Sequence, residues 1–126
     1  MVRIMTKICL IIPDIPPSNN KYQGRGSQKE HIIDYQEEKT KWGWLVRAYI
    51  NKKPKKPFER AIVKITYYFP DKRRRDPDNY SGKFILDGLV DSNIIADDSF
   101  FNIKLILDAK TDRDKPRTMV EVWDRT

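Results

Sequence analysis

One segment constrains the fold more than any other: residues Ala61 to Phe69 alternate between the two faces of an extended chain. Every second side chain from Val63 to Phe69 is apolar or aromatic. A period of two is that of a β-strand with one buried face. Pro70 ends the pattern, and the charged run from Arg73 to Asn79 follows at once. The chain therefore carries a dense cluster of charges directly off a strand of its sheet.

The other apolar patterns predict two helices and three further strands, in the order β-α-β-α-β-β. The strands are predicted at 7–12, 102–110 and 118–123, and the helices at 35–51 and 80–91. Asp34 with Glu37 resembles a capping box for the first helix, and Asp78 or Asn79 can cap the second. We expect the last two strands to pair antiparallel. Residues 1–126 then form a single two-layer α+β domain, a mixed or antiparallel sheet with helices on one face.

The charge balance favours a polyanionic partner. The chain has 126 residues and a net charge of +7, from 25 Lys and Arg against 18 Asp and Glu. Its longest apolar run, Ile8 to Ile12, is far shorter than the roughly 20 residues of a spanning helix, and we find no signal peptide. Cys9 and His31, each the only residue of its kind, exclude an internal disulfide and a zinc site. We expect a cytoplasmic protein that does not bind membranes.

The acidic residues gather in two places, Asp76 with Asp78 and Asp97 with Asp98. In an extended segment, residues two apart point the same way, so Asp76 and Asp78 can converge on one ion. The second pair lies one helix and one turn later, and we expect the chain to return it to the same end of the sheet. Mg²⁺ prefers carboxylate oxygens together with water and phosphate oxygens. The pattern indicates a metal-dependent phosphodiesterase site beside arginines.

Simpler interpretations exist for each part of this pattern. Asp-Pro-Asp-Asn also suits a polar turn with a helix cap, and the arginines could pair with nearby carboxylates. The basic connector Lys52 to Lys56 suits a solvated linker, and Lys83 could pair with Asp87 one helical turn away. A calcium loop of the EF-hand type is excluded because its glycine and glutamate positions hold Ser81 and Asp87.

Four motifs in order resemble the RusA family of Holliday junction resolvases. Pro16 to Tyr22 is similar to the family's P-P-S-x-N loop, and Arg73 to Asn79 to its R-R-x-D-x-D-N motif. Lys83 to Leu89 resembles its K-x-x-x-D-x-L helix, and Asp97-Asp98 its D-D motif. The spacing from Asn79 to Lys83 is one residue longer than in the family motif.

The resemblance implies a homodimeric endonuclease of bacterial or prophage origin that acts in DNA recombination and repair. It would place symmetric nicks in a four-way DNA junction, using one or two Mg²⁺ ions, or Mn²⁺, and no small-molecule cofactor. Asp76, Asp78 and Asp98 would be catalytic metal ligands, and Lys83 would be the catalytic lysine. We further expect Asp97, Asp87 and Asn79 to contact these residues and hold them in position. DNA contacts are expected from Arg73, Arg74, Arg75, Asn19, Asn20, Lys21, Lys52, Lys53, Lys55 and Lys56.

Two other functions are compatible with the same residues. One is a basic DNA-binding protein without catalysis, in which the acidic cluster is only a turn. The other is a nuclease for a different branched or flapped DNA. Divalent-ion dependence separates the first from a resolvase, and a comparison of branched substrates separates the second.

Overall fold

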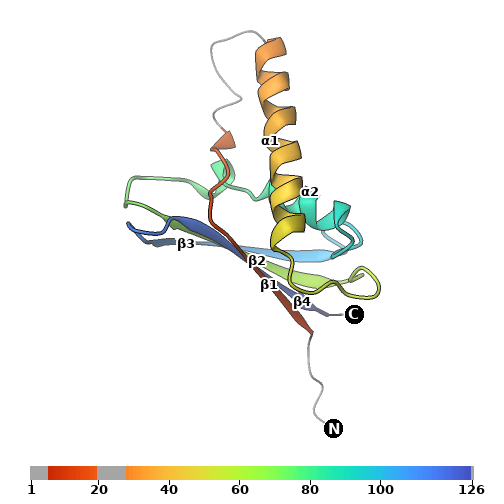
Figure 1. Cartoon of the computed structure of the whole chain (residues 1–126). Coiled ribbons are helices and arrows are strands. Elements are labelled where there is room, and N and C mark those ends of the chain that lie inside the picture. The colour runs from red at the N-terminus through yellow and green to blue at the C-terminus, as the bar shows by residue number, and fades with distance from the viewer. Residues whose placement is uncertain (1–5, 20–27, 126) are drawn as a thin grey trace.

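A mixed four-stranded sheet with two helices on one face forms the fold (Figure 1). The computed structural model describes residues 6–19 and 28–125. The sheet order is β1-β4-β2-β3, and the elements are β1 (Lys7–Ile12), α1 (Gln28–Tyr49), β2 (Ala61–Phe69), α2 (Lys83–Asp91), β3 (Ile103–Thr111) and β4 (Arg117–Asp124). The α+β prediction and the element order are confirmed. No helix in this described part is long and apolar enough to cross a membrane.

The strand pairing differs from the sequence prediction at one point. β4 does not pair with β3: it lies between β1 and β2, antiparallel to both. β3 pairs with β2 in parallel, with Ala61 opposite Ile103. Burial explains the order. Alternate residues of β4 from Thr118 to Val122 are fully buried, which suits a central strand, whereas the largely exposed β3, with Lys104, suits an edge.

The core lies between the sheet and the two helices. Val63 and Ile65 of β2 are fully buried in one cluster with Trp42 of α1 and with Ile85 and Leu89 of α2, among others. The two helices approach closely at Gly88, where a Cβ would lie 2.9 Å from the Cγ2 of Val46. A larger residue at position 88 would therefore separate α2 from α1.

Both helices begin at other residues than the capping patterns predicted. Helix α1 starts at Gln28, so Asp34 and Glu37 lie inside the helix and are exposed. A capping residue needs non-helical backbone angles, which a residue six positions into a helix does not have.

The second helix starts later than predicted. Pro77–Asn79 forms a separate 3₁₀ helix, η2, and α2 follows from Lys83 with Gly82 as its N-cap. The φ angle of Gly82 is 80°, in the left-handed region that glycine adopts most readily. Asp78 and Asn79 therefore lie in η2 and are not caps of α2, and their carboxylate and amide groups are available at the surface of the loop.

Candidate functional site

The loop that leaves β2 is held in a fixed shape by Arg75. Its Nη1 donates to Oδ1 of Asp71 at 2.9 Å and to the carbonyl of Arg73 at 3.1 Å. Its guanidinium also lies 4.3 Å from the ring centroid of Phe69, at the end of β2. The backbone N–H of Arg73 and the side chain of Arg75 both donate to Asp71 and lower the pKa of its carboxyl. Arg75 therefore braces the loop, and we expect its neighbours to contact a ligand.

The next turn directs Asp76 and Asp78 differently. Asp76 has extended backbone angles, φ −102° and ψ 142°, but Asp78 lies inside the 3₁₀ helix η2. The extended geometry that we expected of this segment is therefore present at Asp76 but not at Asp78, where the chain turns into η2. Oδ1 of Asp76 accepts from Nε of Arg74 at 3.2 Å. The Asp78 residue is exposed.

A polar hollow of about 300 Å³ opens beside this turn. All three arginines of the loop line it, together with one carboxylate and three other polar residues: Ser18, Arg73, Arg74, Arg75, Asp76, Asn79 and Tyr80. Guanidinium groups match the geometry of phosphate oxygens. The hollow is thus suited to hold one phosphodiester group next to the Asp76 carboxylate.

The segment that begins with Pro16-Pro17 braces the turn from the other side. Nδ2 of Asn19 donates to the carbonyl of Asp78 at 2.9 Å and to Oγ of Ser81 at 3.3 Å. In this structure Asn19 therefore positions the backbone around Asp78, although we expected it to contact DNA. Asn20 and Lys21, two further expected DNA contacts, lie outside the described residues.

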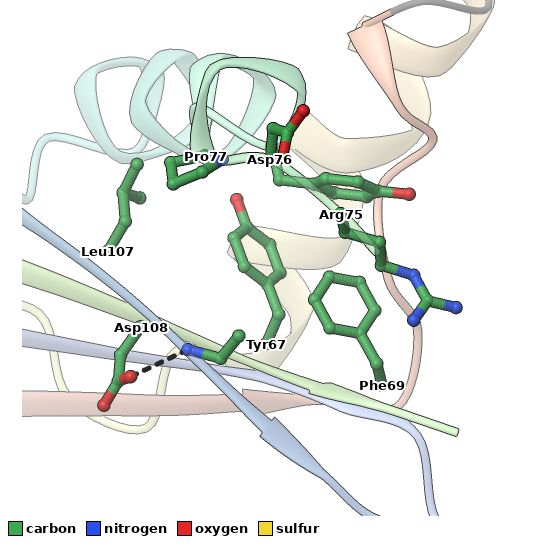
Figure 2. A pocket seen from close by; sticks show the side chains of 9 residues that line it. Tyr67, Phe69, Arg75, Asp76, Pro77, Leu107 and Asp108 are labelled. Carbon is green, nitrogen blue, oxygen red and sulfur yellow. Dashed lines mark hydrogen bonds between the residues drawn. The ribbon is translucent and has the colours of Figure 1, made fainter. Parts of the chain in front are cut away.

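An aromatic cavity of about 230 Å³ lies between the loop and the sheet (Figure 2). Tyr67, Phe69 and Tyr80 line it, together with Asp76, Pro77 and Leu107, and Leu107 lies beside Pro77. The Tyr67 side chain is almost fully buried, and its hydroxyl has no hydrogen-bond partner among the described residues. Burial raises the pKa of Tyr67 far above its ordinary value. This support was not predicted from the sequence, in which the run of aromatic residues at the end of β2 is its signal.

Asp87 and Asp98 form a second charged group, together with Lys83 of α2. Lys83, the first residue of α2, has its Nζ 5.8 Å from the ring centroid of Tyr35. A hydrogen bond with Tyr35 raises the pKa of Lys83, and Asp87 and Asp98 raise it further. Partial burial raises the pKa of Asp87, whereas the positive charges of Lys39 and Lys83 act to lower it. Asp98 therefore lies close enough to Lys83 and Asp87 to act on both.

The turn that carries Asp97 and Asp98 lies at the opposite end of β2 from the arginine-rich loop (Figure 1). The N–H of Ala96 donates to the carbonyl of Phe58, just before β2, whereas Asp76 faces Tyr67 near its end. Our expectation that both pairs share one end of the sheet is wrong. Because β3 runs parallel to β2, α2 must carry the chain back to the start of β2.

The single chain consequently does not gather the expected metal ligands. Within residues 6–19 and 28–125, no group of three or more His, Cys, Asp or Glu side chains could hold a metal ion. The carboxyl of Asp97 accepts from the N–H of Asp98 at 2.8 Å, which shapes its own turn. The exposed lysines of the connector 52–56 precede β2, at the same end as Asp98.

Most of the chain matches one known protein family. The sequence model of endodeoxyribonuclease RusA matches residues 14–123. The chain belongs to the RusA family. The match confirms the resemblance and spans both acidic pairs, the arginine run and Lys83. RusA-family membership implies the nuclease activity of a Holliday junction resolvase. No individual curated protein matches the sequence.

Proposed function

We propose that this RusA-family protein is a Mg²⁺-dependent endonuclease that resolves four-way DNA junctions by paired, symmetric nicks. The observation that carries the proposal is the hollow in which Arg73 and Arg74 stand beside Asp76, in a chain of this family. The arginines supply positive charge for a phosphodiester, and the carboxylates supply oxygen ligands. Both components of metal-assisted phosphodiester hydrolysis are thus present at one loop.

The roles of the loop residues follow from their contacts. Arg74 is almost entirely exposed apart from its contact with Asp76, and Arg73 is exposed, so both can reach a DNA backbone. Arg75 is only 13% exposed at its side chain and holds the loop in shape. Asn79 lines the same hollow and can donate its amide to a phosphate oxygen. The backbone that carries these phosphate-binding groups would therefore be held in shape by Arg75 before DNA binds.

The donor chemistry of the loop fits Mg²⁺, although the single chain brings only two of the three aspartates to this loop. Mg²⁺ is commonly held by one or two carboxylates, with water and substrate phosphate oxygens completing its shell. Asp76 and Asp78 would be these carboxylates. Asp98 would join them when the protein assembles on DNA. Mg²⁺ held there would polarise a phosphate oxygen and lower the pKa of a bound water.

Lys83 would act as a fixed positive charge near the scissile phosphate. Its pKa is raised from the ordinary value of 10.5, so the amine stays protonated at neutral pH and cannot accept a proton as a base. A protonated lysine can stabilise the negative charge that develops on the phosphoryl oxygens. Asp87 and Asp98 would hold this charge in place rather than take part in proton transfer.

Paired nicks need two sites in a symmetric arrangement. A homodimer with a two-fold axis matches the symmetry of a four-way junction and places one site on each of two opposing strands. The basic connector at Lys52, Lys53, Lys55 and Lys56 would add sequence-independent contacts with the DNA arms, because phosphate attraction needs little geometric precision.

The decisive experiment compares the cleavage of a four-way junction, a flap and a linear duplex, each in Mg²⁺ and in EDTA. We expect two nicks at symmetric positions, in the junction alone and only with Mg²⁺. Tight junction binding without cleavage in any divalent ion would instead identify a non-catalytic DNA-binding protein. Equal cleavage of the flap would identify a nuclease of broader branched-DNA specificity.

A further inference from the structure

Two phenylalanines stand fully exposed at the tip of a β-turn. Phe100 is 102% exposed and Phe101 90%. They are the central residues of the turn that the N–H of Asn102 closes on the carbonyl of Ser99 at 3.0 Å. Central positions of such turns are usually taken by glycine, proline or small polar residues. Exposed aromatic residues in their place are characteristic of a contact surface.

The turn is braced rather than free. Oγ of Ser99 donates to Oδ1 of Asn102 at 2.6 Å, and Nδ2 of Asn102 donates to the carbonyl of Glu59 at 3.0 Å. The N–H of Ala61 also donates to the carbonyl of Asn102 at 2.9 Å, which fixes the turn to the start of β2. The backbone that carries both rings is therefore held in place, so little backbone entropy is lost when a partner binds the turn.

The surroundings of the turn indicate the partner. A hollow of about 350 Å³ is lined by both phenylalanines and by three cationic residues, Arg60, Lys104 and Arg125. In a two-fold contact with a second copy, the same surface would face itself and oppose these cations to each other. A partner with anionic groups and flat apolar faces fits better. Unstacked nucleotides have both, as phosphates and as bases.

We propose that Phe100 and Phe101 form a wedge that stacks on unpaired or unstacked bases at the branch point of a DNA junction. The proposal rests on the proposed function, since it requires branched DNA as the substrate. Apolar side chains that enter between base steps hold DNA in an opened or kinked form. Asp98 lies only two residues before Phe100, so the wedge would couple opening of the junction to the placement of this carboxylate.

The test uses a four-way junction with 2-aminopurine at the branch point, in EDTA so that the DNA stays intact. The fluorescence of 2-aminopurine rises when the base leaves the stack. We expect a rise with the wild type and little rise with Phe100→Ala/Phe101→Ala at saturating protein. We also expect the junction Kd of this variant to be at least about fivefold higher, with linear duplex binding unchanged. Phe100→Tyr/Phe101→Tyr, which keeps both rings, should give the same fluorescence rise as the wild type.

Ile11→Ala is the matched control, because Ile11 is 52% exposed on β1, at the other edge of the sheet from β3. It should behave as the wild type does. A full fluorescence rise and unchanged junction affinity in the double alanine variant would overturn the wedge while leaving junction cleavage intact. Conversion of the double variant from dimer to monomer in sedimentation would also overturn it, in favour of a self-association surface. Absence of junction binding by the wild type would overturn both proposals.

Discussion

The two acidic regions of this chain are built in different ways. At the end of β2, Asp76 lies among arginines, in a loop that Arg75 and Phe69 hold in place. Just before β3, Asp98 is exposed, and its charge helps to raise the pKa of Lys83, the first residue of α2. The first region already resembles a phosphate-binding site. In the second, the three cations Arg60, Lys104 and Arg125 line the hollow at the phenylalanine turn, and Asp98 is not part of its lining.

The proposed metal ligands are therefore not gathered within the described part of a single chain. The parallel pairing of β2 with β3 separates the two aspartate motifs, since α2 must return the chain to the start of β2. The loop at Asp76 can hold a phosphate by itself, whereas Asp98 can join it only through a change in the assembly. We therefore expect substitutions in the two regions to have equal effects on cleavage but different effects on the free protein.

The largest effect is expected from the metal-binding aspartates. Asp78→Asn should lower the rate of junction cleavage in Mg²⁺ by at least about 100-fold, because it replaces an anionic ligand by a neutral amide. Junction binding in EDTA should be unchanged. Asp98→Asn should cause a comparable loss of cleavage. Cleavage rates under single-turnover conditions and gel-shift titrations measure the two quantities.

The free protein then separates the two aspartates. In the absence of DNA, the affinity for Mn²⁺, measured by titration calorimetry, should be weaker in Asp78→Asn and unchanged in Asp98→Asn. Wild-type cleavage by Asp78→Asn would contradict the site itself. A loss of Mn²⁺ binding in the DNA-free Asp98→Asn protein would show that the two regions already meet in the free molecule, contrary to this structure.

Lys83→Gln should lower the cleavage rate by about 100-fold with little change in KM, because it removes charge stabilisation that develops in the transition state. The protonated amine is the active form, and its pKa is raised above 10.5. Deprotonation of Lys83, and the fall in cleavage rate that it causes, therefore shifts to higher pH. The wild-type pH–rate profile should thus show no decline from Lys83 below pH 10.

Tyr35→Phe is the control for this prediction. It removes the hydrogen bond that is the largest cause of the raised pKa, so the decline should begin at a lower pH while the rate at pH 7 changes little. A Lys83→Gln variant that keeps the wild-type rate would exclude a catalytic role for Lys83. The simpler interpretation, that Lys83 only pairs with Asp87, would then stand.

A smaller effect distinguishes two arginines of the same loop. Arg73→Gln should weaken junction binding and reduce the slope of log Kobs against log salt by about 1, because one phosphate contact is lost. Arg75→Gln should leave that slope unchanged and instead lower the free energy of unfolding by about 1 kcal/mol, through loss of the contact with Phe69. Salt titrations and denaturant unfolding measure these two outcomes. Equal salt slopes for both variants would show that Arg75 also binds DNA.

The chemical character of both regions could be predicted from the sequence, and their separation could not. Charge clustering after a strand identified the loop at Asp76, and apolar spacing correctly predicted a helix in the region of α2, where Ile85 and Leu89 are buried. Strand pairing is different: β3 has the same alternation whether it runs parallel to β2 or antiparallel to β4, so periodicity cannot choose between them.

Two local features also lay beyond sequence patterns. The left-handed backbone of Gly82 delays α2 past Asp78, and Tyr80-Ser81-Gly82, the stretch that lengthens the family spacing, connects η2 to α2. A Cβ at position 82 would collide with the side chain of Ile65, which shows that tertiary packing as well as the turn requires glycine here. The capping interpretation of Asp78 failed because it used residue type without these backbone angles.

The smallest effect is expected beneath the loop, at Tyr67. Its hydroxyl is buried without a hydrogen-bond partner in the described part of the chain, so Tyr67→Phe removes an unsatisfied polar group and keeps the ring. We expect the free energy of unfolding to stay the same or rise by up to about 1 kcal/mol, measured in urea. A fall of more than about 1 kcal/mol would mean that the hydroxyl has a bonded partner, such as a water in the cavity of about 230 Å³. In that case the loop at Asp76 would rest on an ordered polar support that the region around Asp98 lacks.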